Sequence, residues 1–285
     1  MRLCRFDDDR LGLVKGDEVL DVSEAIGVIP ETRWPAPPGD ALIAHLDAVC
    51  AEVAKLEGAA TAKPIKNVTL KSPVANPTKV IGAPVNYAKH IEESQADPQI
   101  APGQKILGIE DYGPFLKANS SLVGPGEGVA LRFTDRRNDH EGELGVVISK
   151  TGVDIPLEKA GDYIAGYALA LDMTVRGNED RSVRKSLDSY SVLGPWLVTK
   201  DEIADPNSLD LKLWVDDEVR QDSNTSYLIF NVEKLISWCS SFYTLHPGDI
   251  IMTGTPEGVG PVKAGNTITL EIEQVGRMEV AVRNA

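Results

Sequence analysis

The sequence predicts a mixed, β-rich α/β protein in which a small N-terminal α+β domain precedes a larger domain built mainly of strands. Two observations lead to this prediction. From Val80 onward, short β-rich runs alternate with glycine and proline, which number 25 and 18 of the 285 residues. Residues 1–75 differ, because short strand patterns there are followed by one helical pattern. We therefore expect domains at 1–75 and 76–285.

The N-terminal domain is expected to contain strands in the segments LCRF, GLVKG and EVLDV, which are separated by turn residues. Residues 41–56, ALIAHLDAVCAEVAKL, carry apolar side chains at helical spacing and predict one helix. A polar segment punctuated by proline, KPIKNVTLKSPVANPTK, then leads to the second domain and contains one strand.

The second domain is expected to be a strand-rich unit with two helices. The helices are predicted at 86–95 and at 232–245, where Val232, Leu235, Ile236 and Cys239 fall on one face. No repeat of fixed period is present in the sequence. The strand-forming segments are KVIGAP, GPFLKANSSLVGPGEGV, ELGVVISK, YIAGYALALDMTV, GPWLVT, LDLKLWVDDEV, GDIIMTGTPEGVGPV and NTITLEIEQV.

Charge and cysteine content narrow the class of protein. The formal net charge is −14 and the isoelectric point is about 4.8, whereas a nucleic-acid binder is expected to be basic. The three cysteines form no CxxC pair, which indicates a reducing compartment, and we expect a cytoplasmic protein. We find no signal peptide and no apolar run near the ~20 residues of a membrane span. An anionic substrate would therefore need a metal ion or a few placed cationic side chains.

Three acidic residues are candidates for a metal site. In the segment HEGEL, Glu141 and Glu143 are two apart and would project from one face of a strand. Asp172 ends the nearly apolar run YIAGYALALD, as if a buried strand delivers a carboxylate to its rim. Together they would form an open oxygen-rich site for Mg²⁺ or Mn²⁺. The alternatives are a solvated acidic strand face for the glutamates and a helix cap or surface acid for Asp172.

Other candidates could supply proton transfer and positive charge. His90 and Glu93 share a face of the predicted helix, where the carboxylate would orient the imidazole as a general base. Arg176 and Lys185 follow Asp172 and could receive a substrate carboxylate or an oxyanion. Each of these also has an ordinary reading, as a helical surface pair or a surface charge. The Gly-rich loop in 248–260, which contains Thr255, would let backbone N–H groups approach a ligand.

Several common motifs are missing from the sequence. It contains no GxxxxGK[ST], GxGxxG, GxSxG or HExxH pattern, which disfavours a phosphate-binding loop, dinucleotide binding, serine hydrolase chemistry and zincin chemistry. No cluster of Cys and His at ligand spacing is present, which makes zinc a poor candidate.

In combination, these segments resemble the fumarylacetoacetate hydrolase family over roughly residues 80–283. The resemblance is carried by VNYAKHIEE, PFLKANSSLVGPGE, HEGELGVVI, IAGYALALDMTVR, RKSLDSYSVLGPWLVT, DDEVRQDSNTSYLIFNVEKLISW, LHPGDIIMTGTPEGVG and AGNTITLEIE. It implies a β-roll catalytic domain with a smaller N-terminal domain. It also implies a homo-oligomer, either a dimer or a dimer of dimers.

The resemblance assigns roles to individual residues. It implies that Glu141, Glu143 and Asp172 bind Mg²⁺ or Mn²⁺. It implies catalytic roles for His90, Glu93 and Lys185. It implies that the substrate is bound by Arg176, Thr255 and Lys117. His90 and Glu93 match a mobile lid segment of the family.

The chain departs from the family pattern at three places. His140 stands before the E-x-E motif where an aromatic residue is common, and in a strand it would point away from the ligands. Ala118 follows FLK where proline is common. Residues 177–179 are Gly-Asn-Glu where acidic or amide residues usually follow the arginine, which puts substrate contacts in doubt more than metal binding.

The resemblance implies hydrolysis of a carbon–carbon bond in a 2,4-diketo acid, which gives pyruvate or a related 2-keto acid and a carboxylic acid. As a hypothesis, the substrate is a 2,4-diketo-3-deoxy sugar acid, because the polar segments 94–99 and 181–190 could line a pocket that tolerates hydroxyl groups. Alternatives are decarboxylation of oxaloacetate-like acids, isomerisation or hydration of dienoic acids, and a non-catalytic metal-binding scaffold. We expect a small keto acid as the partner, with no nucleic acid and no membrane.

Overall fold

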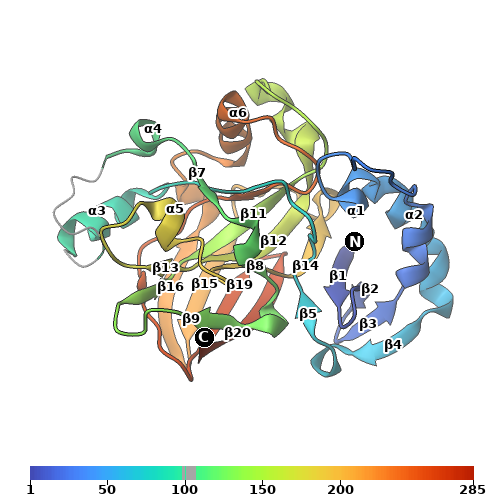
Figure 1. Ribbon diagram of the computed structural model, residues 1–285, viewed down its shortest axis with the longest axis horizontal. Coiled ribbons are helices and arrows are strands. Elements are labelled where there is room, and N and C mark those ends of the chain that lie inside the picture. Colours follow the sequence, from blue (N-terminus) through green and yellow to red (C-terminus); the bar gives the residue numbers. More distant parts are fainter. Residues whose placement is uncertain (98–99, 101–106) are drawn as a thin grey trace.

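The computed structural model describes residues 1–97, 100 and 107–285, and strands dominate it (Figure 1). In these residues, twelve strands join in one sheet with the order β4-β3-β2-β1-β14-β12-β11-β17-β6-β7, while β5 pairs with β1 and β8 with β14. The predicted β-rich α/β class is confirmed. The strands of this sheet are β1 (Arg2–Phe6), β2 (Arg10–Lys15), β3 (Glu18–Asp21), β4 (Thr61–Pro64), β5 (Leu70–Lys71), β6 (Val80–Gly82), β7 (Phe115–Lys117), β8 (Leu122–Val123), β11 (Gly142–Ile148), β12 (Ile164–Asp172), β14 (Ser191–Thr199) and β17 (Ile250–Met252).

The centre of the large sheet is buried on both faces. Every residue of β11, β12 and β14 is buried, which explains why these segments are almost continuously apolar. Successive side chains of β11 enter different parts of the core: Val146 and Ile148 pack in one apolar cluster, and Val147 packs in the other.

Two smaller sheets complete the strand-rich region. The order β16-β15-β19-β20-β9 forms a five-stranded sheet, and β13-β10-β18 forms a three-stranded sheet. Gly142 lies where the five-stranded sheet meets β11, because a Cβ atom there would stand 2.8 Å from Leu213 Cδ1 and 3.0 Å from Leu270 Cδ1. These strands are β9 (Val129–Leu131), β10 (Asn138–His140), β13 (Thr174–Val175), β15 (Asp210–Val215), β16 (Glu218–Asn224), β18 (Gly260–Pro261), β19 (Thr267–Ile272) and β20 (Gly276–Asn284).

The N-terminal segment continues the large sheet. Strand β1 pairs with β14, with Leu3 opposite Leu197, so backbone hydrogen bonds cross the expected boundary at residue 75. The division at that residue stays a prediction. The helix expected at 41–56 is interrupted at His45, which gives α1 (Ala41–Ala44) and α2 (Leu46–Leu56). Asp40 caps α1 by accepting hydrogen bonds from two backbone N–H groups.

Two helices of the second region lie near their expected positions. Helix α3 (Ala88–Ala96) begins later than expected, because Tyr87 is still extended and forms a β-bridge with Leu228. Helix α6 (Val232–Phe242) ends earlier, because Leu245 exchanges backbone hydrogen bonds with Gly152. The predicted inner face of α6 is confirmed, since its four named residues are buried. Two short helices, α4 (Ile109–Tyr112) and α5 (Arg181–Arg184), were not predicted.

Helices and surface charge show how the molecule is organised outside its sheets. Figure 1 places α3, α4 and α5 at one end of the molecule and α1 and α2 at the other.

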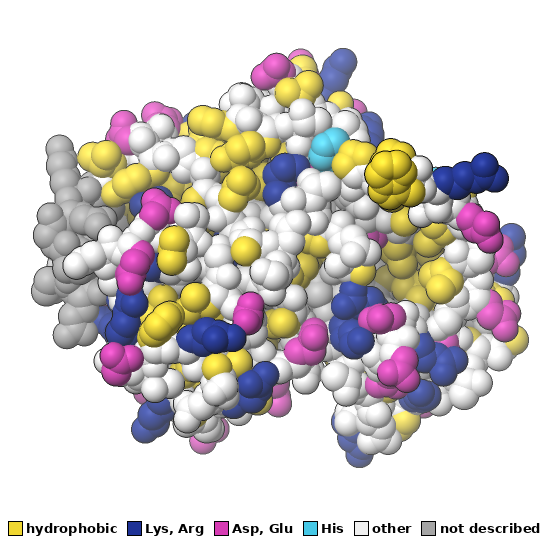
Figure 2. Space-filling model, viewed as in Figure 1, with side chains coloured by type: hydrophobic (Ala, Val, Ile, Leu, Met, Phe, Trp, Pro, Cys, Tyr) yellow, Lys and Arg dark blue, Asp and Glu magenta, His cyan; other side chains and the backbone are white. Residues whose placement is uncertain are grey.

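On the face drawn in Figure 2, basic and acidic side chains are interspersed. Within the described ranges, no helix has the length and apolarity needed to span a bilayer. Short 3-10 helices occupy Ser23–Val28, Glu57–Ala59, Ile65–Asn67, Asn119–Ser121, Pro125–Glu127, Leu157–Tyr163, Lys200–Glu202 and Thr225–Tyr227.

Candidate active site

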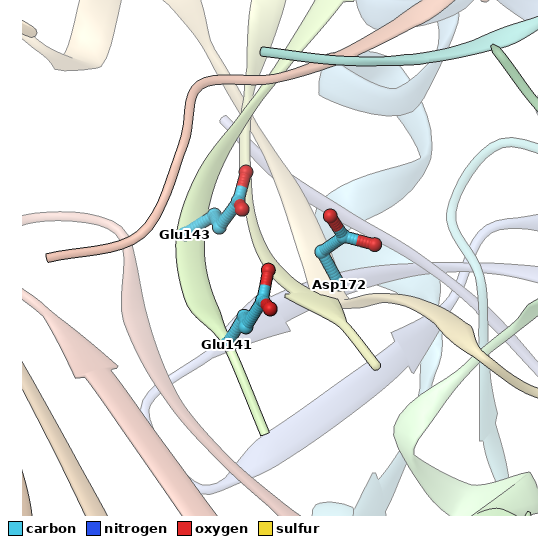
Figure 3. A group of neighbouring side chains, drawn as sticks. All are labelled: Glu141, Glu143 and Asp172. Atoms are coloured by element: carbon cyan, nitrogen blue, oxygen red, sulfur yellow. The ribbon is translucent and has the colours of Figure 1, made fainter. Parts of the chain in front are cut away.

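Three buried carboxylates converge at the place where β11 begins and β12 ends. Glu141 immediately precedes β11, Glu143 lies in it, and Asp172 ends β12. The backbone N–H of Asp172 donates to the carbonyl of Glu141 at 2.9 Å, which continues the antiparallel pairing and places the two side chains across from each other. Figure 3 shows the carboxylates turned toward one another, and one oxygen of each lies within 4.8 Å of the others. The strand alternation proposed for the E-x-E motif therefore brings the predicted ligands together.

Two lysine ammonium groups contact this cluster. Lys185 Nζ lies 2.5 Å from Glu141 Oε2 and 2.6 Å from Asp172 Oδ2. Lys117 Nζ contacts Asp172 and donates to the carbonyl of Tyr190 at 2.7 Å. Burial opposes the charge on Glu141, but Lys185 and Arg176 outweigh burial and hold the pKa of Glu141 well below its usual range.

Glu143 has a different environment. Its Oε2 accepts a hydrogen bond from Gly254 N–H at 2.7 Å, and among the described residues no cationic side chain pairs with it within 4.0 Å. Burial, followed by the negative charges of Asp172 and Glu141, raises the pKa of Glu143 well above its usual value. A buried oxygen cluster with one uncompensated acid fits a hard divalent cation such as Mg²⁺ or Mn²⁺.

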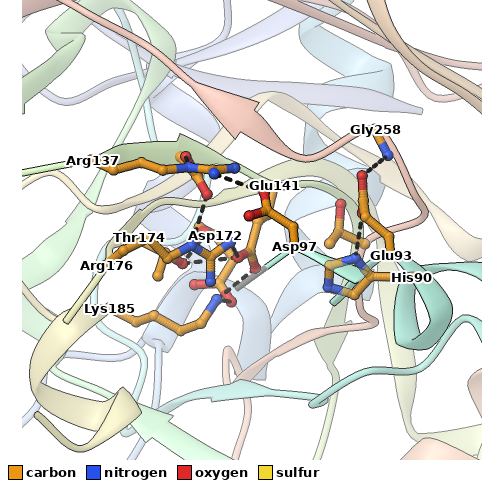
Figure 4. Close-up of polar contacts among 12 residues, drawn as sticks. His90, Glu93, Asp97, Arg137, Glu141, Asp172, Thr174, Arg176, Lys185 and Gly258 are labelled. Carbon is orange, nitrogen blue, oxygen red and sulfur yellow. Dashed lines mark hydrogen bonds and ion pairs between the residues drawn. The ribbon is translucent and has the colours of Figure 1, made fainter. Parts of the chain in front are cut away.

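His90 and Glu93 form the expected pair on α3. His90 Nδ1 lies 2.9 Å from Glu93 Oε2, and Gly258 N–H donates to Glu93 Oε1 at 2.9 Å (Figure 4). Gly258 has a φ of +94°, and a Cβ there would stand 1.8 Å from Arg220 O, so this close approach requires glycine. The Gly-rich loop thus positions the Glu93 carboxylate, and the carboxylate orients the imidazole of His90 through Nδ1. The other ring nitrogen, Nε2, is then available for proton transfer.

A chain of ion pairs supports the arginine that follows Asp172. Arg176 Nε donates to Asp139 Oδ2 at 2.7 Å, and its guanidinium also reaches Glu141 Oε1 at 3.1 Å. Asp139 accepts a second bond from Arg137, which in turn pairs with Asp97 on the segment after α3. Glu141 Oε1 also accepts from the Thr174 hydroxyl at 3.0 Å (Figure 4).

Thr255 lies between the carboxylate strand and the Gly-rich loop. Its hydroxyl donates to the carbonyl of Gly142 at 3.0 Å and accepts a bond from Gln221 Nε2 at 2.7 Å. Gln221 Oε1 in turn accepts from Gly142 N–H at 2.9 Å. Gln221 on β16 therefore binds the N–H of Gly142, between the two glutamates, directly, and it binds the carbonyl of Gly142 through the Thr255 hydroxyl.

One cavity collects most of the predicted residues. His90, the three ligand candidates, Arg176, Lys185 and Thr255 all line it. Glu93 acts on it through His90. Lys117 does not line it, because the side chain is buried against Asp172, and its predicted role in substrate binding stays a prediction. The roles of the other residues also stay predictions, although their placement in one cavity agrees with them. Of the segment 94–99 expected near a hydroxyl-tolerant pocket, residues 98 and 99 lie outside the described residues.

Sequence reasoning missed several residues of this site. Asp139 belongs to the same alternation as Glu141 and Glu143, so the strand pattern already contained a signal for it. Gln221 lay in a segment of the family resemblance but received no role. Tyr112, which also lines the cavity, received no prediction. Ser94, Arg181 and Arg184 line it too, and they belong to the segments 94–99 and 181–190 that were expected to line a pocket.

His140 takes no part in the carboxylate cluster. It is buried, and neither ring nitrogen has a hydrogen-bond partner within the part of the chain that the structure describes. Burial lowers the pKa of His140 to about 4, so the ring is neutral near pH 7.

Comparisons with known proteins agree with this geometry. The chain is 55% identical over 286 aligned positions to maleylpyruvate hydrolase of Aquipseudomonas alcaligenes, and all of both chains is covered. It is 39% identical, with a TM-score of 0.84 and complete coverage of both chains, to a crystal structure of maleylpyruvate hydrolase from Sphingobium sp. SYK-6 in complex with manganese(II) ion and pyruvate. It is also 36% identical to 2,4-didehydro-3-deoxy-L-rhamnonate hydrolase of Sphingomonas sp. (strain SKA58), over 97% of this chain and 94% of that protein.

These relatives confirm two predictions made from the sequence, namely the fold class and an enzyme of the acylpyruvate-hydrolase type. The fumarylacetoacetate (FAA) hydrolase C-terminal family matches residues 79–283, close to the segment that carried the resemblance. The chain therefore belongs to the fumarylacetoacetate hydrolase family.

Proposed function

We propose that the protein hydrolyses maleylpyruvate, or a closely similar dicarboxylic 2,4-diketo acid, to pyruvate and a dicarboxylic acid. One observation carries this proposal: His90, which is paired with Glu93, lines the same cavity as a cluster of three buried carboxylates. The 55% identity to a maleylpyruvate hydrolase over the whole chain supports the choice of substrate.

Glu141, Glu143 and Asp172 would hold a divalent cation. When bound, such a cation supplies Lewis-acid chemistry, since it polarises the oxygens of the keto acid and stabilises enolate charge. Manganese is supported by the ion in the Sphingobium structure, and magnesium remains the alternative that the sequence predicts.

His90 would act as the general base. With Nδ1 oriented by Glu93, its Nε2 takes a proton from water, and the water oxygen attacks the C4 carbonyl carbon of the diketo acid. The C3–C4 bond then breaks, C4 leaves as a carboxylic acid, and the electron pair stays on C3 as the enolate of pyruvate. Protonation of C3 then gives pyruvate, and the reaction consumes one water molecule for each C3–C4 bond broken.

Cationic side chains would receive the negative charge of the substrate. Lys185 and Arg176 line the cavity, and their contacts with Glu141 fix their positions beside the ligand cluster. Lys185 would stabilise the enolate that forms on bond cleavage. Arg176 would orient the substrate, held in place by Asp139. Thr255 lines the same cavity and would contact the keto acid from the side of the Gly-rich loop.

Other reactions remain as alternatives to be tested. The sugar-acid substrate expected from the sequence is supported by the 36% identical rhamnonate-type hydrolase. Decarboxylation of oxaloacetate and isomerisation of dienoic acids use similar enolate chemistry. A homo-oligomeric state and a cytoplasmic location stay predictions.

The test is release of pyruvate from purified protein with Mn²⁺, with Mg²⁺ and with EDTA. The panel contains maleylpyruvate, acetylpyruvate, a 2,4-diketo-3-deoxy sugar acid and oxaloacetate. We expect metal-dependent hydrolysis of maleylpyruvate with the highest kcat/KM of the panel, and its loss in Glu141→Ala and His90→Ala. Faster turnover of the sugar acid would move the assignment to that substrate, and turnover of oxaloacetate alone would contradict the hydrolase.

A further inference from the structure

Two arginines on α5, Arg181 and Arg184, line the cavity. Among the described residues, neither Arg181 nor Arg184 forms an ion pair within 4.0 Å, whereas Arg176 and Lys185 both do. Arg184 Nε donates to the carbonyl of Glu179 at 2.8 Å, which uses one of its five N–H donors. The guanidinium of Arg181 lies 4.2 Å from the ring centroid of Tyr112.

The position of these arginines follows from the local structure. Asp180 caps α5 by accepting the N–H of Ser182, so the helix begins at Arg181. Residues three and four apart share a helix face, which places Arg181 beside Arg184 and Lys185. Because Lys185 reaches the ligand carboxylates, this face of α5 is the one that faces the cavity.

No carboxylate of the described residues lies within ion-pair distance of either arginine. The three candidate ligand carboxylates contact or lie near Lys117 and Lys185, and with a divalent cation bound, the cluster would carry one net positive charge. The α-keto carboxylate of a substrate would neutralise that charge. The two arginines then remain uncompensated, and a second carboxylate at the far end of the substrate would balance them.

A buried hydroxyl group also lines this cavity. Ser94 on α3 lies one turn beyond His90 and lines the cavity, its residue is 4% exposed, and its Oγ has no hydrogen-bond partner within residues 1–97, 100 and 107–285. An unpaired buried hydroxyl is destabilising, and a hydrogen bond to a ligand oxygen would remove that cost. The hydroxyl is therefore a second, independent sign that a polar group of the substrate belongs in this cavity.

We propose that Arg181, Arg184 and Ser94 form a subsite for the distal carboxylate of the substrate. The subsite makes the enzyme selective for dicarboxylic 2,4-diketo acids over monocarboxylic ones, and it rests on the hydrolase function proposed above. Arginine suits this role because its planar guanidinium donates two parallel bonds to a carboxylate.

The test compares kcat/KM for maleylpyruvate, which has a distal carboxylate, with kcat/KM for acetylpyruvate, which has a methyl group there. In Arg181→Gln and Arg184→Gln we expect the ratio of the two values to fall by about 10–100-fold, mainly through the KM for maleylpyruvate. Ser94→Ala lowers it less. Arg132→Gln is the matched control, because Arg132 is exposed, pairs with Asp188 and lies outside the cavity lining, so it keeps the wild-type ratio.

The outcomes separate this inference from the function on which it rests. Wild-type turnover of maleylpyruvate with an unchanged ratio in both arginine variants overturns the subsite and leaves the hydrolase intact. Failure of the wild type on both compounds overturns the hydrolase and the subsite together. Stabilisation of each variant by Mn²⁺ in thermal unfolding shows that the fold and the carboxylate cluster persist, and Arg184→Lys, which retains the charge, is expected to recover part of the ratio.

Discussion

Replacing Glu143 with glutamine asks whether the carboxylate cluster is built around a cation. Glu143 is 2% exposed and accepts a hydrogen bond from Gly254 N–H. Glutamine has nearly the same shape and keeps a side-chain oxygen for that bond. At a pH above the raised pKa of Glu143, the substitution therefore removes a negative charge while retaining the packing, and its effect reports on electrostatics.

The magnitude follows from the spacing of the acids. One oxygen from each of Glu141, Glu143 and Asp172 lies within 4.8 Å of the others. Two like unit charges at about 4.8 Å repel by about 3 kcal/mol at an effective dielectric constant of about 20. The lysines offset part of this repulsion, so we expect Glu143→Gln to stabilise the metal-free protein by about 1–3 kcal/mol. The corresponding rise in Tm is roughly 2–4 °C per kcal/mol.

Thermal unfolding in EDTA and in Mn²⁺ measures both halves of this argument. Wild-type protein gains about 2.7 kcal/mol at a metal concentration of about 100 times Kd, whereas the variant gains little because one ligand is neutral. Glu158→Gln, at an exposed position, is the control and should behave like wild type. The reasoning is refuted if Glu143→Gln is less stable than wild type in EDTA and Mn²⁺ still stabilises it fully.

Three further predictions concern the base, the metal and the loop. His90→Gln lowers kcat by about 10²–10⁴-fold in steady-state assays while the Mn²⁺-induced shift in Tm persists; undiminished kcat would exclude His90 as the base. Burial, followed by the charges of Asp172 and Glu141, raises the pKa of Glu143. Below that pKa, Mn²⁺ binding must release the proton of Glu143, so the affinity for Mn²⁺ weakens as the pH falls through it. Calorimetry in buffers of different ionisation enthalpy measures the proton, and equal heats would contradict it. Gly258→Ala destabilises the fold by at least about 1 kcal/mol, since φ is +94° and Cβ meets Arg220 O, whereas Gly27→Ala, with open space, does not; equal Tm values would contradict the strain.

Much of the site was predictable because its signals are local. Alternation along a strand placed Glu141 and Glu143 on one face, and an apolar run ending in an acid identified Asp172. Helical spacing paired His90 with Glu93. The family resemblance added Lys185, Arg176 and Thr255, which spacing alone could not distinguish from surface charges and loop residues.

The parts that were missed depend on contacts between distant segments. Gln221 comes from β16 and reaches Gly142, a contact that no pattern within either segment indicates. The predicted helix boundaries were wrong for the same reason. Tyr87 is extended because it pairs with Leu228, and α6 stops because Leu245 pairs with Gly152. Local periodicity predicts a helix in both places, and tertiary hydrogen bonds override it.

The pairing of β1 with β14 gives the N-terminal segment a protective role. Strand β14 is buried along its whole length, with β12 on one side and β1 on the other along Arg2–Val198 and Leu3–Leu197. A chain trimmed to begin at residue 76 would expose these apolar residues as an unpaired strand edge, which templates intermolecular β-pairing. Residues 1–75 contribute no residue to the cavity of the candidate active site, and we expect that they protect the rest of the protein against aggregation.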